Sequence, residues 1–298
     1  MIKIITWNIL SPFYCDSSGY HGYDPEVLNA DNRRKKVFEI LWVFISQKER
    51  PIICLQEVPI DWRGDLETFF YNNDYTIFSI GYGVKKSGFF GISTVIPNEY
   101  RMERVDYIQV GKYIDASRGN KEINSLVRKG KNKRNVSIRL LLNRDFPFYL
   151  YNYHMPLSSI ELQILHVDAL KKMISLHKDV GTILAMDSNL ISGQEGYNYL
   201  TEGVLTNKLG SFFDKIDESK LKSSYKEVNK SEPDYTNYSV SKIGGNFKET
   251  IDYILITDHF KVKSSKVLLK TGEKCPNRIC PSDHLPLESI LEKKYYRK

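Results

Sequence analysis

The feature that most limits what this chain can fold into is an alternation of short β-rich runs with longer amphipathic segments. Two segments, Arg33–Gln47 and Ile160–His177, carry apolar residues near 3.6-residue spacing and predict helices. Seven shorter runs rich in β-branched and aromatic residues predict strands: Ile2–Ile9, Pro51–Leu55, Phe89–Ile96, Val136–Leu142, Phe148–His154, Gly181–Met186 and Ile251–Ile256. The alternation is compatible with an α/β protein, although it does not select one architecture.

Composition excludes several other classes. Among 298 residues, 41% are hydrophobic and 27% charged, as in ordinary globular domains. The longest apolar stretch, Val37–Ile45, is interrupted by Glu39 and is far shorter than the ~20 residues of a membrane span. The N-terminal sequence MIKIITWNIL does not resemble a signal peptide. Four cysteines without a CxxC pair suggest neither a disulfide framework nor a zinc site. We therefore expect a soluble protein of the cytoplasm or another reducing compartment, without membrane association.

The organisation of the chain favours one domain over residues 1–298, because no fixed-period repeat and no Pro/Gly-rich linker divides it. Two segments are predicted to be long loops. Arg118–Arg134 contains seven basic residues and one acidic residue, and it could be a solvated loop or an arm that contacts phosphate. Asp214–Pro233 is polar and is expected only to connect its neighbours. The net charge of +7 favours a phosphate-bearing partner.

Polar residues at the ends of the predicted strands are the main indication of chemistry. Singly, each would be a turn former or a satisfied polar group. Together at one sheet edge they would suit a hard cation and a phosphate: Asn8, Glu57, Asn152, His154, Asp187, Asn189, Asp252, Asp283 and His284. Oxygen ligands such as Glu57 and Asp283 favour Mg²⁺ or Mn²⁺, and the lack of a Cys/His set argues against zinc.

Six of these segments, in their order along the chain, resemble a known family. TWNIL, LQEV, NYH, MDSN, IDYI and SDH are similar to the successive motifs of the endonuclease/exonuclease/phosphatase superfamily, the deoxyribonuclease I-like proteins, from Thr6 to Leu287. A narrower resemblance is to the carbon catabolite repression-type deadenylases, the branch with nocturnin, Angel proteins and the 2′-phosphodiesterase. It rests on LNADNRRKKVFEIL, ICLQEV, GFFGIST, YTNY, FKETIDYI and PSDHLPL.

The resemblance implies a four-layer α/β sandwich, in which two packed, mostly antiparallel mixed sheets are flanked by helices. It also implies hydrolysis of a phosphodiester with Mg²⁺, for which Mn²⁺ should substitute. By motif, Glu57 would be the principal metal ligand, with Asn8 and Asp283 close to the ion or its waters.

Further roles follow from the same resemblance. Asp187 would orient or deprotonate the attacking water, and Asn189 would bond a non-bridging phosphate oxygen. His284, held by Asp252, and His154 would contact the phosphate. The expected substrate-binding residues are Asn152, Phe247, Lys248 and Asn237, and Phe247 matches in spacing a phenylalanine that stacks on a base.

The chain departs from the family pattern at three places. Met186-Asp187-Ser188-Asn189 stands where the family usually has Gly-Asp-Phe-Asn, yet the Asp and Asn remain, so we expect activity to survive. The NYHMP segment is shorter than in the deadenylases, where a proline and a phenylalanine sandwich an adenine, and Pro156 is a poor positional match for that proline. The chain also begins at the first motif, so no leucine-rich-repeat docking module is expected.

These observations leave several functions open. The leading hypothesis is a 3′→5′ exoribonuclease acting on single-stranded, A-rich RNA, because a stacking ring beside a basic groove is typical of single-strand binding. The second is hydrolysis of a small substrate, a 2′,5′-oligoadenylate or a nucleotide phosphate, in the same fold. An inactive nucleic-acid-binding module is disfavoured because none of the metal-binding or water-handling residue types is replaced. A DNA-repair endonuclease lacks support from the branch-specific segments.

Overall fold

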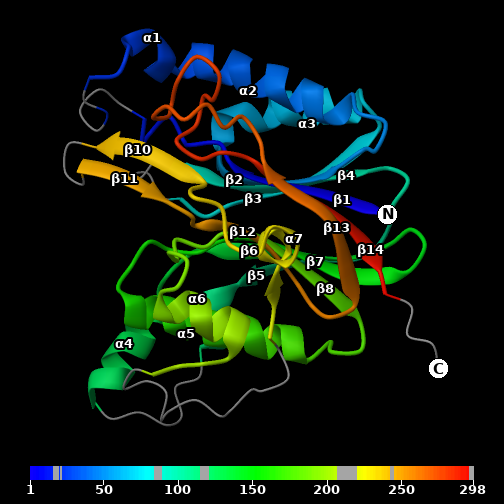
Figure 1. The fold of residues 1–298 in the computed structure, drawn as a ribbon, viewed down its shortest axis with the longest axis vertical. Helices are drawn as coiled ribbons and strands as arrows, with labels where there is room; N and C mark the ends of the chain where they lie inside the picture. Colours follow the sequence, from blue (N-terminus) through cyan, green and yellow to red (C-terminus); the bar gives the residue numbers. More distant parts are fainter. Residues whose placement is uncertain are drawn as a thin grey trace.

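Four layers build the molecule, in the order helices, sheet, sheet, helices (Figure 1). The structure is a computed structural model, and it describes residues 1–15, 20, 22–83, 89–114, 121–206, 220–241 and 245–294. Within these ranges no helix has both the length and the apolar content that crossing a bilayer requires.

The first sheet has the strand order β13-β14-β1-β2-β4-β3. Only β1 and β2 are parallel; the other neighbours are antiparallel. Its strands are β1 Ile2–Asn8, β2 Ile52–Pro59, β3 Tyr75–Gly81, β4 Phe90–Pro97, β13 Phe260–Val267 and β14 Leu287–Lys293.

The second sheet has the order β5-β6-β7-β8-β12-β9, with β7 and β8 as its parallel pair. Its strands are β5 Arg101–Gln109, β6 Val136–Asn143, β7 Pro147–His154, β8 Gly181–Asp187, β9 Lys222–Ser223 and β12 Asp252–Ile256. A separate antiparallel hairpin, β10 Asn237–Ser241 and β11 Gly245–Glu249, stands beside the two sheets (Figure 1).

Helices cover the outer face of each sheet. The helices over the first sheet are α1 Pro25–Leu28, α2 Ala30–Ile45, the 3-10 turn η1 Ile60–Trp62 and α3 Arg63–Tyr71. Those over the second are η3 Val110–Tyr113, α4 Lys121–Lys131, α5 Ile160–Ser175 and α6 Glu195–Glu202, while the short α7 Ser224–Asn229 packs on β12 and β13.

Three apolar clusters join these layers. One lies between the sheets, where Ile4, Leu140 and Ile254 are fully buried. The other two lie between each sheet and its helices, with Trp7 in the first and Leu170 in the second. The central strands β1, β2, β4, β8 and β12 are buried along their whole length, because each sheet is covered on both faces, and the apolar stripes on α2 and α5 complete this layered core.

The predicted fold is confirmed: the two sheets are mixed, mostly antiparallel and flanked by helices. All seven predicted strands and both predicted helices are present, with ends that differ by a few residues. The largest difference is at β2, which continues four residues beyond Leu55.

Both predicted loops were partly wrong. Lys121–Lys131, within Arg118–Arg134, forms helix α4, because Val127 is buried and Leu126 packs beside it against the core under the second sheet. A basic run with an apolar pair on one side is thus an amphipathic helix. The segment Asp214–Pro233 contains β9 and α7, while residues 207–219 lie outside the described residues.

Strand direction places the functional side chains at one edge. The parallel strands β1 and β2 end beside each other, with Asn8 opposite Gln56. In the second sheet, His154 at the end of β7 is opposite Asp187 at the end of β8. The antiparallel strand β12 begins there, with Asp252 opposite Asp187. The ends of both sheets therefore supply one site.

Candidate active site

Glu57 reaches the site because β2 is irregular there. The pairing of β2 with β4 shifts between Leu55 and Val58, and Glu57 has a left-handed φ of 53°. Its Oε2 accepts from the backbone N–H of Ser11 at 2.9 Å. Burial raises the pKa of the Glu57 carboxyl, an effect that the nearby His154 opposes. A bulge that turns one side chain toward a site is a common use of this feature.

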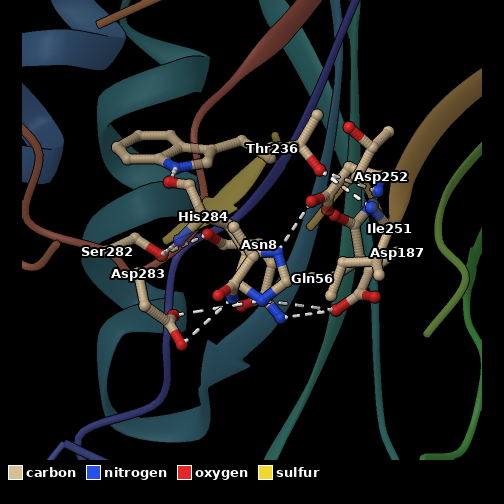
Figure 2. A network of polar contacts seen from close by, with 12 residues as sticks. Asn8, Gln56, Asp187, Thr236, Ile251, Asp252, Ser282, Asp283 and His284 are labelled. Atoms are coloured by element: carbon tan, nitrogen blue, oxygen red, sulfur yellow. Dashed lines mark hydrogen bonds and ion pairs between the residues drawn. The ribbon is translucent and has the colours of Figure 1, made fainter. Parts of the chain in front are cut away.

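Asn8 connects two carboxylates of the site. Its Nδ2 donates to Glu57 Oε1 at 3.1 Å and to Asp187 Oδ2 at 2.8 Å. The amide orientation is fixed because Asn8 Oδ1 accepts from the backbone N–H of Leu10 at 2.9 Å. Asn8 thus holds one carboxylate from each sheet, as Figure 2 shows for its bond to Asp187.

Asp252 and His284 form a buried pair behind Asp187. His284 Nδ1 is 2.8 Å from Asp252 Oδ2, and both residues are buried. Burial opposes charge on the imidazole, but Asp252, Asp187 and Asp283 outweigh it and raise the pKa of His284 well above its ordinary value. Burial also raises the pKa of Asp252 to about 6, against the attraction of His284. At neutral pH the pair is therefore an imidazolium and a carboxylate.

Main-chain and hydroxyl contacts fix the segment that carries this histidine (Figure 2). Trp7 Nε1 donates to the carbonyl of His284 at 3.0 Å, and Ser282 Oγ donates to the carbonyl of Asn8 at 2.6 Å. The N–H of His284 donates back to Ser282 Oγ at 3.1 Å. The Ser282–His284 turn is thereby tied to the end of β1.

Asp283 lines the cavity with one oxygen that accepts no hydrogen bond from the described residues. Its Oδ2 accepts from the Tyr20 hydroxyl at 3.0 Å and from Asn237 Nδ2 at 3.3 Å. Its Oδ1 is buried and has no hydrogen-bond partner among the described residues. Burial, and then the charge of Asp283, raise the pKa of Tyr20, so this hydroxyl stays protonated and donates. A buried carboxylate oxygen without a donor is the atom that a cation would satisfy.

His154 is held by a tyrosine that the sequence did not reveal. The Tyr82 hydroxyl is 2.6 Å from His154 Nδ1, and the other ring nitrogen, Nε2, lies 3.4 Å from Asp187 Oδ2 and 4.0 Å from Glu57 Oε1. Burial raises the pKa of Tyr82 well above its ordinary value, so the hydroxyl keeps its proton and can donate to Nδ1. In the neutral imidazole this leaves the ring proton on Nε2, facing Asp187.

Close strand packing brings Tyr82 to this position. Tyr82 directly follows β3, whose Gly81 pairs with Gly91 of β4. A Cβ at Gly91 would lie 1.8 Å from the carbonyl oxygen of Ile80, so no larger residue fits without moving the strands. The end of β3 thereby lies where the Tyr82 ring meets Phe90 and His154 edge-on.

One cavity of about 740 Å³ opens over these groups. Eight of the predicted residues line it: Glu57, His154, Asp187, Asn189, Asn237, Phe247, Asp283 and His284. Its other lining residues include Tyr14, Tyr20, Tyr82, Phe90, Pro156 and Leu157, and the basic residues Lys133 and Arg134. An apolar wall with a few convergent polar groups is typical of small-ligand sites.

Asn189 enters the cavity from a left-handed backbone position with φ of 52°. Its Nδ2 donates to the carbonyl of Met155 at 2.8 Å, and its N–H donates to Asp187 Oδ1 at 3.1 Å. The second hydrogen on Nδ2 is left for another acceptor.

The other predicted residues lie just outside the cavity lining. Asn8 and Asp252 are nearly fully buried behind the residues they hold. Lys248 is exposed, with its ammonium 4.7 Å from the ring centre of Tyr235 and 4.8 Å from that of Tyr238. A cation over two rings is held on the surface of the hairpin.

The structure gives Asn152 a different place from the predicted one. It is fully buried between the sheets, where its Nδ2 contacts the carbonyl of Ser93 at 3.0 Å and its Oδ1 accepts from Gln56 Nε2 at 2.8 Å. These bonds satisfy its amide and join β7 to β2 and β4. Asn152 therefore positions strands, and we do not retain it as a substrate-binding residue.

Sequence reasoning missed Tyr20, Tyr82, Thr236 and Ser282. Thr236 Oγ1 accepts from the N–H groups of Ile251 and Asp252, at 3.1 and 3.0 Å, and so fixes the start of β12. Thr236 lies inside the YTNY segment and Ser282 directly precedes Asp283, so both motifs carried a signal. Nothing in the sequence near Tyr20 or Tyr82 indicates their partners, which are distant along the chain.

A metal ion could be held here in two ways. Asp187, Asp252 and His284 form a buried group whose ligand atoms lie within 4.8 Å of one another. However, the 2.8 Å contact between His284 and Asp252 already uses one ligand atom of each. Glu57 and Asp283 both line the cavity, whereas Asp252 does not, although Asp252 Oδ1 and Asp283 Oδ1 both lack a hydrogen-bond partner among the described residues. The all-oxygen pair is the better fit for a hard divalent cation.

The comparisons with known proteins found solved structures with a similar fold, but no match to a family model or a curated protein sequence. Among solved structures, ANGEL2, described as a 2′,3′-cyclic phosphatase in complex with adenosine-2′,3′-vanadate, superposes with a TM-score of 0.75 at 19% identity, covering 97% of this chain and 95% of that one.

Two further structures agree. The human nocturnin catalytic domain with a bound sulfate gives a TM-score of 0.67 at 20% identity, covering 98% of this chain and 94% of that one. A mannosyl-6-phosphatase from Bacteroides thetaiotaomicron gives 0.64 at 15% identity, covering 98% and 100%. The fold that the resemblance implied is thus the fold of these solved structures, ANGEL2 and nocturnin among them.

Proposed function

We propose that this protein is a divalent-cation-dependent hydrolase of phosphate esters that acts on a nucleotide-bearing substrate. One observation carries the proposal: Glu57, Asp187 and Asp283, with the charged His284, converge on one cavity that also has an apolar wall. Carboxylates would repel a phosphate unless a cation lay between them, and the unpartnered Oδ1 of Asp283 suits such an ion. Glu57 and Asp283 would hold the ion, with Asn8 fixing Glu57. When bound, Mg²⁺ or Mn²⁺ would supply charge neutralisation at the phosphate.

The protein's own groups can carry out the remaining chemistry. Asp187 Oδ2 lies 3.4 Å from His154 Nε2 and 3.7 Å from His284 Nε2, so both imidazoles flank the carboxylate that we assign to water activation. Asn8 holds this carboxylate from behind. His284, kept charged by Asp252, would stabilise negative charge on the phosphate in the transition state. Asn189 would donate its remaining amide hydrogen to a non-bridging oxygen.

The apolar wall supports binding of a base. Phe247 lies on β11, whereas Pro156 and Leu157 follow β7, far earlier in the chain. All three nevertheless line the same cavity. Pro156, a poor positional match in the sequence, is thus brought to the cavity that contains Phe247. We therefore keep single-stranded, A-rich RNA as the leading substrate, degraded from its 3′ end as the deadenylase resemblance implies.

A second candidate is a small nucleotide phosphate ester, such as a 2′,5′-oligoadenylate or a cyclic phosphate. The volume of about 740 Å³ is that of a small-molecule pocket. The description of ANGEL2 as a 2′,3′-cyclic phosphatase favours the same class.

A substrate panel tests both candidates. The purified protein is incubated with oligo(A), mixed RNA, single-stranded DNA, 2′,5′-oligoadenylate and adenosine 2′,3′-cyclic phosphate, in Mg²⁺, in Mn²⁺ and in EDTA. Turnover of at least one substrate that EDTA abolishes supports the proposal. Turnover that persists in EDTA, or none with any substrate, would contradict it. Preference for oligo(A) over the small esters selects RNA.

Base stacking is tested by replacing the ring at the cavity wall. Phe247→Ala should raise KM by about 5–150-fold, the equivalent of about 1–3 kcal/mol for one base on one aromatic ring. Tyr71, an aromatic residue on α3 that is 80% exposed and outside the cavity lining, provides the control Tyr71→Ala. Equal KM values for the two variants would remove Phe247 from the substrate site.

A further inference from the structure

We infer that Lys133 and Arg134 form a second anion subsite, which binds a phosphate other than the one that is hydrolysed. The inference rests on the proposed function and specifies its substrate: a nucleotide that carries a second phosphate, either the next phosphate of an oligonucleotide chain or a terminal phosphomonoester.

The cavity is lined by side chains of both charges. Glu57, Asp187 and Asp283 supply carboxylates at the reaction site, whereas Lys133 and Arg134 are the only lysine or arginine among the described residues that line the same cavity. A substrate phosphate beside the carboxylates needs a cation between the charges. A phosphate bound by Lys133 and Arg134 needs none, so the two sets of side chains suit two different phosphates of one molecule.

Among the described residues, no carboxylate pairs with either basic side chain. Every other charge-bearing group that lines the cavity has a partner, such as Asn8 for Glu57 or Asp252 for His284. For Lys133 and Arg134, the described part of the chain offers no ion pair within 4.0 Å. Two cations that lack a partner in the described part of the chain are available to an anionic ligand at the cavity.

The backbone that carries these residues is anchored on both sides. The N–H of Lys133 donates to the carbonyl of Gly130 at the end of α4 at 3.1 Å, and the carbonyl of Lys133 accepts from Gln109 Nε2 at 3.0 Å. Directly after Arg134, Asn135 Nδ2 donates to the carbonyl of His154 at 2.9 Å. The subsite is thereby fixed to the strand end that carries a predicted phosphate-contacting histidine.

The position of Lys133 and Arg134 is related to that of helix α4. α4 is a basic amphipathic helix beneath the second sheet, and its C-terminal end leads directly to Lys133 (Figure 1). Arg128 and Lys129 on α4 are exposed and do not line the cavity. The basic run of the sequence thus divides into an outward-facing helix and a short cavity-lining segment.

Binding without turnover gives the most direct test. In the Asp187→Asn variant, which should not turn over, the affinities of the dinucleotide ApA, of pApA with a 5′ phosphate and of ApAp with a 3′ phosphate are measured by isothermal titration calorimetry in Mg²⁺, because the scissile phosphate needs a cation. This protein should bind one of the two phosphorylated dinucleotides about 10–100-fold more tightly than ApA, the range for hydrogen bonds to charged groups. Which of the two binds more tightly identifies the side of the scissile bond on which the subsite lies.

Two double variants with equal charge changes separate the subsite from general electrostatics. Lys133→Gln/Arg134→Gln, made in the Asp187→Asn protein, should reduce the preference to about threefold or less, whereas Arg128→Gln/Lys129→Gln in the same protein should retain it. Adenosine 5′-diphosphate and adenosine 5′-phosphate, compared in the same way, report whether a second phosphate on a mononucleotide is also recognised.

Equal affinities for the three dinucleotides, or a preference that persists in Lys133→Gln/Arg134→Gln, would overturn the subsite. The same substrates, incubated with the wild-type protein in Mg²⁺, then test the hydrolase separately. Tight, variant-sensitive binding without turnover would refute the proposed function and leave the subsite standing. Turnover by a protein that binds the three dinucleotides equally would overturn the subsite and leave the proposed function standing.

Discussion

Arg33 is predicted to be the residue on which the geometry of the active-site loops most depends. It lies in the first turn of α2 and is 1% exposed. Its Nε donates to the carbonyl of Pro281 at 2.6 Å, and its Nη2 donates to the carbonyls of Ile9, at 2.8 Å, and Leu10. One guanidinium thus joins the segment after β1 to the segment before Asp283.

The size of the effect follows from these contacts. In Arg33→Lys the charge is kept, but a single ammonium replaces a planar fork and can satisfy about one of the three carbonyls. Two buried acceptors are then left without a donor, at about 1–3 kcal/mol each. The free energy of unfolding should fall by about 2–6 kcal/mol, a large part of the usual 5–15 kcal/mol of a domain.

Urea denaturation followed by circular dichroism measures this change, with Arg34→Lys as the matched control. Arg34 is the next residue on the helix, is partly exposed and pairs with Asp65, so its replacement should change the free energy of unfolding by less than about 1 kcal/mol. If the two variants unfold within about 1 kcal/mol of each other, the assignment of Arg33 as the link between the loops is refuted.

Two further outcomes are expected. Tyr82→Phe removes the 2.6 Å hydrogen bond to His154 and should lower kcat about 2–13-fold with KM unchanged. The control Tyr71→Phe, at an exposed position, should change neither kcat nor KM. Equal kcat values for the two variants would contradict the positioning of His154 by Tyr82. Burial lowers the pKa of His166 to about 4 from its ordinary 6.5. Below pH 6.5 the unfolded chain therefore takes up a proton that the folded protein excludes. The free energy of unfolding should fall by up to about 3 kcal/mol between pH 6.5 and pH 4. His166→Gln should flatten urea-unfolding stability against pH in that window; an unchanged slope would assign the loss to other groups.

The strand ends show how much of the site the sequence could predict. Asn8, Asp187 and Asp252 each follow or begin a short apolar run, and parallel or antiparallel pairing brings them to one edge. The sequence pattern therefore predicted which strand ends bring polar side chains to one edge of the sheets. It could not show that Asn8 bridges Glu57 and Asp187, because this depends on the bulge in β2.

Residues recruited from distant segments could not be predicted in the same way. Tyr82 contacts a histidine 72 positions away, and Tyr20 contacts an aspartate 263 positions away. Single tyrosines in this tyrosine-rich chain carry no local signal of such partners. Asn152 shows the opposite error: it lies two residues before His154 within a motif, but strand alternation alone does not say that its side chain is satisfied between the sheets.

The helices α4 and α7 were not predicted for a related reason. The run that contains α4 reads as polar because its basic residues outnumber its apolar ones, and only the burial of Val127 reveals the face that packs. The short α7 is preceded by Ser223, whose side chain caps the helix by accepting from the N–H of Lys226, a signal too common to stand out in a polar segment.

Cation binding by Glu57 tests the central claim most directly. Mn²⁺ binding is followed by electron paramagnetic resonance, and hydrolysis of the best panel substrate is measured in the same samples. Losing a residue that only supports a metal ligand typically weakens metal binding by about 10–100-fold. Glu57→Gln, which alters a ligand itself, should weaken Mn²⁺ binding by more than this and should abolish turnover. The control Glu67→Gln, on the exposed surface of α3, should match the wild-type protein in both. Wild-type Mn²⁺ affinity and turnover in Glu57→Gln would contradict the assignment of this cavity as a cation-dependent hydrolytic site.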